Sequence, residues 1–173
     1  REHLQYDAVG QVSTRILGPG TATPLVTHWH YNSAGQMLRQ IDGNNDTTYF
    51  IYDQAGPQGY QVDAEGYVTE QVRDGNGNVT ALKHYRDAVA PSQWTSGAIA
   101  TLTSAAEVLQ QTAMTYDAAN RLTAETRDPG GALAQTTTYR YDANGNRLEQ
   151  TDPAGVITRW HYDGANRLIK TEA

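Results

Sequence analysis

The 173 residues carry a formal net charge of −6 and a sequence pI near 5.2, and they include no Cys. The acidic balance argues against nucleic acid, which needs a basic surface, and the missing Cys excludes a disulfide framework without excluding export. Hydrophobic residues make up 38 % of the chain, and no apolar run approaches the roughly 18 residues of a membrane span. This composition suits a sheet with one face in water better than a compact two-layer domain.

A short phrase that starts with Tyr-Asp and ends with Leu recurs along the chain. Clear copies occupy residues 116–122, 141–148 and 162–168, and looser copies start at Tyr6, Tyr31 and Tyr52. A recurring phrase of this kind indicates stacked supersecondary units. The chain therefore suggests a wall or a surface before it suggests a catalytic site.

Tetrapeptides that open with Asp or Asn and close with Gly or Asn divide the chain about every 10 or 11 residues, a spacing typical of short strands joined by turns. Asp at the first position accepts a backbone hydrogen bond, and Gly or Asn at the fourth tolerates the left-handed conformation. The openers are Asn32, Asp42, Asp53, Asp63, Asp74, Asp117, Asp128, Asp142, Asp152 and Asp163, with Asp7 as an outlying member and Asp87 as a degenerate one.

The segments between turns alternate apolar and polar residues and are rich in β-branched and aromatic types, as in 68–72, 136–141 and 156–162. This is the period of a half-buried strand, and tight turns join antiparallel neighbours. The predicted fold is all-β: an antiparallel β-hairpin meander of roughly a dozen strands, forming a curved or spiralling sheet. Far-UV circular dichroism dominated by helix would contradict it.

Two insertions interrupt the spacing. Residues 18–24, rich in Gly, Pro and Thr, predict an exposed loop. Residues 88–112 predict a larger insertion with one short helical or loop element, placed between 98 and 111, because 103–111 is helix-prone and Ser104 with Glu107 forms a capping pattern. Apart from these, 1–173 is expected to be a single repeat region. Because it starts at Arg1 rather than Met, we expect it to be a segment of a longer protein.

The iterated Tyr-Asp phrase, with Asp-Pro-x-Gly turns at Asp128 and Asp152, resembles the YD repeats of Rhs proteins, of bacterial Tc toxin shells and of teneurins. The resemblance covers nearly the whole chain apart from the two insertions. It implies a segment of a bacterial, secreted or cell-surface shell that encloses a toxin domain. The family's self-cleavage site is not recognisable here, so no catalytic residue is assigned and the chain is predicted not to be an enzyme.

No metal or cofactor site is predicted. His28 and His30 fall on one face of a strand but lack a third ligand. Residues 42–53 resemble a calcium-binding loop in which Asp42, Asn44, Asp46 and Asp53 would be the ligands. The loop departs from the pattern because Thr47 replaces the required Gly and Asp53 replaces the closing Glu. A similar run at 74–78 is also explained by turns. Ser nucleophile and phosphate-loop motifs are absent.

Two classes of function remain. The first is a structural wall, with the other repeats of the same shell and an enclosed toxin domain as partners. The second is an adhesin-like module that binds glycan or protein through exposed aromatics, although Tyr in phase with the turns favours cross-strand packing. A cut-out ribbon is also expected to self-associate, because it exposes strand edges near residues 4–6 and 167–169. An apolar face carrying Leu122, Leu148 and Leu168 would add to this tendency.

Overall fold

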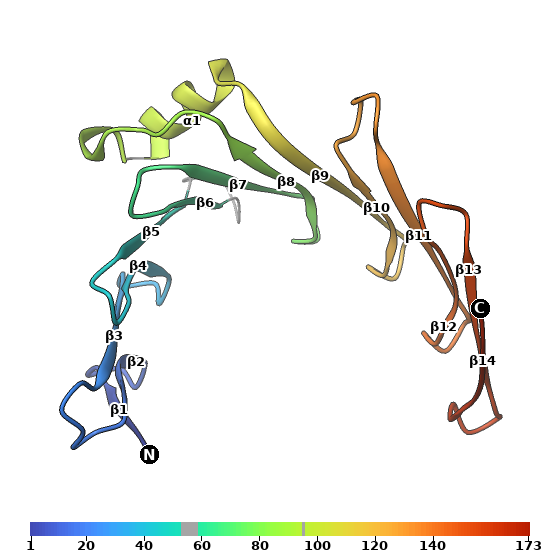
Figure 1. The fold of residues 1–173 in the computed structure, drawn as a ribbon, viewed down its shortest axis with the longest axis horizontal. Coiled ribbons are helices and arrows are strands. Elements are labelled where there is room, and N and C mark those ends of the chain that lie inside the picture. The colour runs from blue at the N-terminus through green and yellow to red at the C-terminus, as the bar shows by residue number, and fades with distance from the viewer. Residues whose placement is uncertain (53–58, 95) are drawn as a thin grey trace. The chain divides into compact units, whose positions relative to one another are not determined.

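The computed structural model describes residues 1–52, 59–94 and 96–173, and these residues form fourteen β-strands and one α-helix. The strands follow one another in chain order in a single antiparallel sheet (Figure 1), so the all-β prediction is confirmed. The elements are β1 (Glu2–Tyr6), β2 (Val12–Leu17), β3 (Leu25–Tyr31), β4 (Met37–Ile41), β5 (Thr47–Tyr52), β6 (Gly59–Val62), β7 (Val68–Arg73), β8 (Val79–Tyr85), a 3₁₀ turn (Pro91–Gln93), α1 (Ser96–Ala105), β9 (Val108–Tyr116), β10 (Leu122–Arg127), β11 (Gln135–Tyr141), β12 (Arg147–Thr151), β13 (Ile157–Tyr162) and β14 (Leu168–Glu172).

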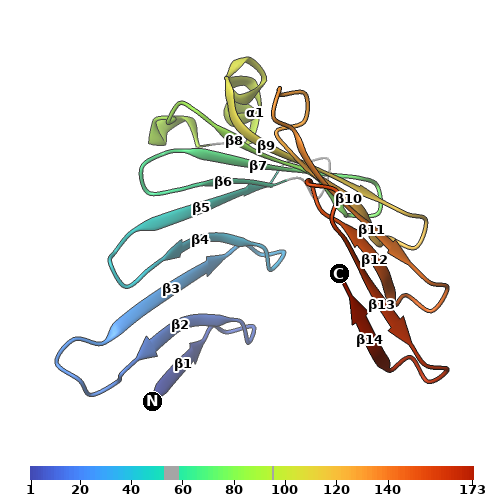
Figure 2. The same cartoon turned by 45° about the vertical axis from the view of Figure 1, so that its right-hand side comes forward.

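The chain divides into two compact units, and the boundaries between them fall within β7 and β8 and before β9. The first unit contains residues 1–70 and 84–107, and the second contains 71–83 and 108–173. Strands β9 to β14 of the second unit form successive hairpins (Figure 2). The two units share a pattern at a constant shift along the chain: Tyr6 and Tyr31 end β1 and β3 as Tyr116 and Tyr141 end β9 and β11.

Most hairpins are closed by the same five-residue turn, whose positions we number one to five. In the turn at 142–146, the Asp142 N–H donates to the Asn146 carbonyl at 3.0 Å and the Gly145 N–H donates to the Asp142 carbonyl at 3.2 Å. Asp142 Oδ1 also accepts from the N–H groups of Asn144 and Asn146, at 2.9 and 2.8 Å. Gly145 has φ of 91°, which explains why position four is Gly or Asn.

The predicted openers at 7, 32, 42, 63, 74, 117, 152 and 163 form the same turn. In the Asn32 turn the side-chain amide oxygen accepts the bonds from Ala34 and Gln36 in place of a carboxylate. Asp53 lies outside the described residues. The hairpins that have Tyr6, Tyr31, Tyr116, Tyr141 or Tyr162 before the turn carry a register shift at that Tyr or directly opposite it, the mark of a β-bulge, which re-aims a side chain.

Asp128 opens a tight turn as predicted, because the Gly131 N–H donates to the Asp128 carbonyl at 3.0 Å, but this turn is not of the five-residue kind. Asp128 itself has φ of 53° and Gly130 has φ of 90°, while the Asp128 N–H donates to the Gln111 carbonyl at 2.7 Å. The matching loop in the first unit starts at Gly18, with φ of 68°, whose N–H donates to the Arg1 carbonyl. Asp128 therefore takes a left-handed position that Gly occupies in the other copy, and Asp is one of the few residues that tolerates it.

The hydrophobic core lies in the first unit, where the insertion between β8 and β9 packs on one sheet face. Ile99 of α1 and Val62 are fully buried, and Val68 is 1 % exposed. Beneath the helix, the Tyr85 hydroxyl donates to the buried Glu70 carboxylate at 2.6 Å. Burial and this carboxylate raise the pKa of Tyr85 well above its usual range.

The predicted position of the helix is wrong in part. Residues 103–111 were expected to be helical with Ser104 as a cap, but α1 ends at Ala105 and β9 begins at Val108. Strand pairing outweighs helix propensity here, because the Arg86 N–H donates to the Glu107 carbonyl and β9 pairs along β10. No helix among the described residues is long and apolar enough to cross a membrane.

Candidate functional site

A row of linked turns is the most regular polar structure of the second unit. The row consists of the turns opened by Asp74, Asp117, Asp142 and Asp163, and in the first three the side chain at position five reaches the next turn in the row. Asn78 Nδ2 donates to Asn120 Oδ1 at 2.8 Å, and Asn146 Nδ2 donates to Asn166 Oδ1 at 2.8 Å. Between them, Arg121 Nη1 donates to the carbonyl of Asp142 at 2.7 Å. In the first unit Gln11 donates in the same way to the carbonyl of Gly35.

The side chain at position five is itself held by the opener of its own turn. Asn146 Nδ2 lies 2.8 Å from Asp142 Oδ2, and Arg121 Nε lies 2.7 Å from Asp117 Oδ2. Asp74 and Asn78 form the matching contact. Each opener thus orients the donor that reaches the following turn, so that the carboxylate both builds its own turn and links it to the next.

These hydrogen bonds lower the pKa of the opening carboxylates. For Asp142 the largest cause is the side-chain amide of Asn146, followed by backbone N–H donors of the turn. For Asp117 it is the Arg121 side chain, while for Asp163 the backbone N–H of Arg167 comes first and its guanidinium second. Hydrogen-bond donors to a carboxylate stabilise its ionised form, so these Asp side chains are ionised at neutral pH.

The repeated tyrosines add a second row of contacts. Each hydroxyl donates to the carbonyl of the first residue after the preceding turn, on the adjacent strand. Among the described residues these bonds run from Tyr31 to Val12, from Tyr116 to Val79, from Tyr141 to Leu122 and from Tyr162 to Arg147, at 2.9, 3.0, 2.9 and 3.2 Å. The Tyr thus does more than pack across strands, because its hydroxyl ties each hairpin to the one before it.

One junction combines both rows. At the β10–β11 boundary the Arg121 guanidinium stacks over the Tyr141 ring at 4.9 Å while its Nη1 binds the Asp142 carbonyl. The Tyr141 hydroxyl returns a bond to the carbonyl of Leu122. Arg is suited to this place because its planar group can stack and donate at once. The signal was visible in the sequence as Arg-Leu after one turn and Tyr-Asp before the next, but sequence reasoning missed its meaning.

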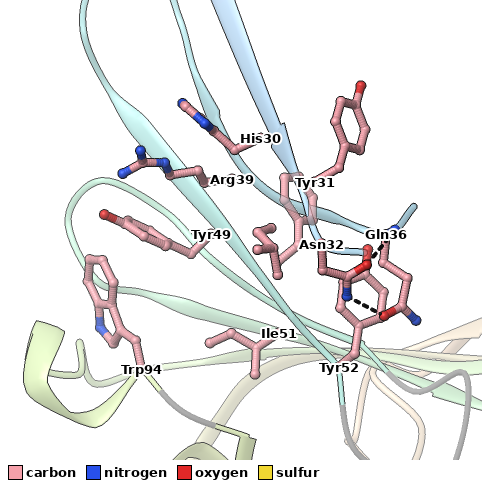
Figure 3. Close-up of a pocket in the computed structure, with 11 residues that line it drawn as sticks. His30, Tyr31, Asn32, Gln36, Arg39, Tyr49, Ile51, Tyr52 and Trp94 are labelled. Carbon is pink, nitrogen blue, oxygen red and sulfur yellow. Dashed lines mark hydrogen bonds between the residues drawn. The ribbon is translucent and has the colours of Figure 1, made fainter. Parts of the chain in front are cut away.

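An open pocket of about 700 Å³ lies in the first unit, on β3 to β5 beside Trp94. His30, Arg39 and Tyr49 face one another across the three strands in register. The ring centroids of Tyr49 and Trp94 are 4.5 Å apart. Figure 3 shows these four side chains gathered on one side of the strands, with Asn32 on the other side. Two aromatic rings tilted at 57° to each other beside one guanidinium could hold a sugar ring or a planar ligand.

Two of the candidate metal ligands, His28 and Asp42, make other side-chain contacts. His28 and His30 share one face of β3, where His28 Nδ1 lies 3.1 Å from Thr14 Oγ1. Burial, Arg39 and His28 lower the pKa of His30. Asp42 Oδ1 accepts from the N–H groups of Asn44 and Asp46, at 2.8 and 3.0 Å. Within 1–52, 59–94 and 96–173, no three His, Cys, Asp or Glu residues form a group that could hold a metal ion.

Comparison with known proteins finds repeats and structures that this chain resembles. A model of the RHS repeat matches residues 132–157 and 141–173. The probable deoxyribonuclease RhsB of Dickeya dadantii is 29 % identical over 190 residues, which cover 96 % of this chain and 13 % of that protein. The TcdB2-TccC3-Cdc42 structure superposes with a TM-score of 0.60 at 22 % identity, over 97 % of this chain and 9 % of that one. The Photorhabdus luminescens Tc holotoxin pore gives 0.59 at 22 % identity, with the same coverage.

The Tyr-Asp turns, the antiparallel hairpins and these matches define a repeat protein of hairpins linked in a row. The RHS repeat is matched within residues 132–173, and the Tyr-Asp turns of the rest of the chain resemble it. The fold of nearly the whole chain is shared by a part of the Tc toxin assembly TcdB2-TccC3. The chain spans about a tenth of the length of the proteins that it matches.

Proposed function

We propose that this chain is a wall segment of an Rhs-type encapsulating shell that encloses and delivers a toxin domain. The observation that carries the proposal is the row of linked turns, in which the position-five side chains Gln11, Asn78, Arg121 and Asn146 each bind the following turn. Such contacts make a sheet whose hairpins hold one another in place, as a wall requires. In this proposal the chain is structural and non-catalytic, and it acts in an exported bacterial protein.

The proposal treats residues 1–173 as one repeat region interrupted by the insertion at 88–112. Further repeats of the same shell and an enclosed toxin domain are its partners. The likeness to TcdB2-TccC3 supports the shell, because that fold covers nearly all of this chain and extends far beyond it. The name of the Dickeya relative does not transfer a nuclease activity, because the match lies on the repeats and covers 13 % of that protein.

The test uses the gene that encodes this segment. We expect its reading frame to continue with Tyr-Asp repeats and to end in a divergent C-terminal domain. In the purified full-length protein that domain should resist protease until the shell is unfolded, while the same domain expressed alone should be cleaved. A reading frame without further repeats, or a C-terminal domain cleaved equally fast in both forms, would overturn the proposal.

The pocket beside Trp94 favours one alternative, an adhesin-like module that binds glycan. A glycan screen followed by calorimetry with Trp94→Ala tests it. Trp160→Ala is the control, because Trp160 stacks with Arg147 in the second unit. Binding that is lost only with Trp94→Ala, together with a surface anchor in the reading frame, would favour the adhesin over the shell.

A further inference from the structure

The two units differ in the charges of a cross-strand triplet, by which we mean three residues that lie opposite one another on neighbouring strands. In the second unit Arg140, Glu149 and Arg159 form such a triplet on β11, β12 and β13. The central Glu149 carboxylate lies 3.8 Å from Arg140 Nη1 and 3.1 Å from Arg159 Nε. This triplet therefore contains its own counter-ion.

The corresponding triplet of the first unit has no counter-ion. His30, Arg39 and Tyr49 lie opposite one another on β3, β4 and β5. The constant shift along the chain that relates the two units places these residues, in the same order, on the triplet of the second unit. A cation, Arg39, thus stands where the second unit has the carboxylate of Glu149.

Arg39 differs from most other arginines of this acidic chain in having no partner. Its side chain is half-buried, and among the described residues it makes no hydrogen bond, ion pair or ring contact. Apart from Arg1, each of the other arginines makes at least one such contact: Arg15, Arg73, Arg86, Arg121, Arg127, Arg140, Arg147, Arg159 and Arg167. Because removing a charge from water is costly unless it is paired, the Arg39 guanidinium suits an anion that comes from outside.

The pocket around Arg39 favours negative charge. Its described lining residues include no Asp or Glu, and Asp46 lines a neighbouring hollow instead. The pKa of His30 is lowered, first by burial and then by the charges of Arg39 and His28. Nearby cations act in this direction, and an anion bound beside Arg39 would offset their repulsion of a proton on His30.

Two aromatic rings border these charged groups. Tyr49 and Trp94 are tilted at 57° to each other, and Figure 3 shows both on the same side of the strands as His30 and Arg39. Their faces can hold the apolar C–H groups of a small ring. Strands β3, β4 and β5 each pair on both sides, so the pocket offers no free strand edge to an extended peptide. A compact ring that carries a carboxylate fits this arrangement better than a peptide.

We propose that this pocket binds an acidic sugar, of the hexuronic acid class, with its carboxylate beside Arg39 and His30 in the place that Glu149 takes in the second unit. The guanidinium donates two hydrogen bonds to the carboxylate, and the His30 ring donates a third. The sugar ring lies against Tyr49 and Trp94. The proposal gives the glycan-binding alternative a chemical class and does not rest on the shell, so its failure would leave the protease test of the shell untouched.

Calorimetric or NMR titration with matched small sugars tests the ligand class. The probes are methyl glucuronide, the corresponding uncharged glucuronamide and acetate. The wild-type chain should bind the glucuronide about tenfold or more tightly than the amide, as expected for hydrogen bonds to a charged group, and added salt should reduce this preference. Equal binding of glucuronide and amide would overturn the proposal. Acetate or a short acidic peptide that binds as tightly as the glucuronide would overturn the assignment to a sugar.

Variants of the two triplets test the position of the carboxylate. Arg39→Gln should weaken glucuronide binding about tenfold and leave amide binding unchanged, a difference that a general loss of structure would not produce. Arg39→Glu, which restores the acidic centre found in the second unit, should abolish glucuronide binding. The control Arg140→Gln removes a charge at the place of His30 in the second unit and should change neither affinity. Equal weakening of both ligands by Arg39→Gln, or the same loss with Arg140→Gln, would overturn the proposal.

Discussion

At the scale of single residues, the five-residue turn explains the composition of the repeat. Its fourth position needs a left-handed backbone, and the described turns place Gly or Asn there with φ between 59° and 93°. Its first position needs an acceptor for two backbone N–H groups, which Asp and Asn supply. Two demands on two positions are enough to make the spacing visible in the sequence.

Gly145→Val should destabilise the protein more than Ala143→Val. An added Cβ at Gly145 meets no atom within 4 Å, so the cost comes from the backbone alone. A β-branched residue at positive φ costs about 1–3 kcal/mol. Ala143 is exposed in the middle of the same turn, where Val should cost under about 0.5 kcal/mol. Thermal or urea unfolding measures the difference, and equal midpoints would refute the turn assignment.

The opening carboxylates predict a loss of stability in acid. Because the folded state lowers the pKa of Asp142, ionisation stabilises the fold above the pKa of the unfolded chain, and this contribution disappears as pH falls through the lower, folded pKa. The melting temperature should therefore decrease once the pH is lowered below about 4. Asp142→Asn keeps an acceptor oxygen for the two backbone N–H groups, as Asn32 does in its own turn, but removes the titrating group, so it should flatten this pH dependence. Asp142→Ala removes the acceptor and should lower the melting temperature at every pH. A steeper acid dependence in Asp142→Asn would contradict this account.

At the scale of elements, the sequence predicted what local geometry decides. Alternation and turn spacing predicted strands, and the structure confirms them at Val68–Arg73 and Ile157–Tyr162. It did not predict which strand would extend into the insertion, because the β9 backbone bonds depend on partners elsewhere in the chain. The contact of Trp94 with Tyr49 and the position-five contacts were missed for the same reason: they join residues that only the folded sheet brings together.

The insertion should contribute much of the stability of the first unit. Ile99 is fully buried against the sheet, so Ile99→Ala should cost about 2–5 kcal/mol by leaving a cavity. Leu109 in β9 is 64 % exposed, and Leu109→Ala should change stability by no more than about 0.5 kcal/mol. Chemical denaturation of the two variants tests the packing. A similar cost for both would show that α1 does not form the core described here.

The turn at 42–46 should not need calcium. Asp42 Oδ1 already accepts two backbone N–H groups, and the same bonds form at turns that have no extra oxygens, such as 152–156. Incubation with a chelator should therefore leave the melting temperature unchanged, with added Ca²⁺ as the matched control. A clear drop with chelator that Ca²⁺ restores would revive Asp42, Asn44, Asp46 and Asp53 as ligands.

At the scale of the whole molecule, the two units rest on different interactions. The first has an apolar core under α1, formed by Tyr60, Val62, Val68, Tyr85 and Ile99. In the second, every described residue is at least partly exposed, and the linked turns and the tyrosine bonds connect its hairpins. This division explains how a chain with 38 % hydrophobic residues folds without a second layer along its whole length: apolar burial is concentrated in one region.

Amide hydrogen exchange should show this division directly. In repeat proteins each unit contacts mainly its neighbours, so parts of the chain can open separately. We expect the slowest exchange in β6 and β7, where Val62 and Val68 are buried, intermediate exchange in β9 to β13, and the fastest in β1 and β14. Ile99→Ala should accelerate exchange in β5 to β7 and leave β11 to β13 almost unchanged, whereas Arg121→Ala should do the reverse, because Arg121 joins hairpins of the second unit only. Uniform protection in all strands, or equal acceleration everywhere by either variant, would mean that the chain unfolds as one cooperative body and that its apolar core stabilises distant hairpins as strongly as near ones.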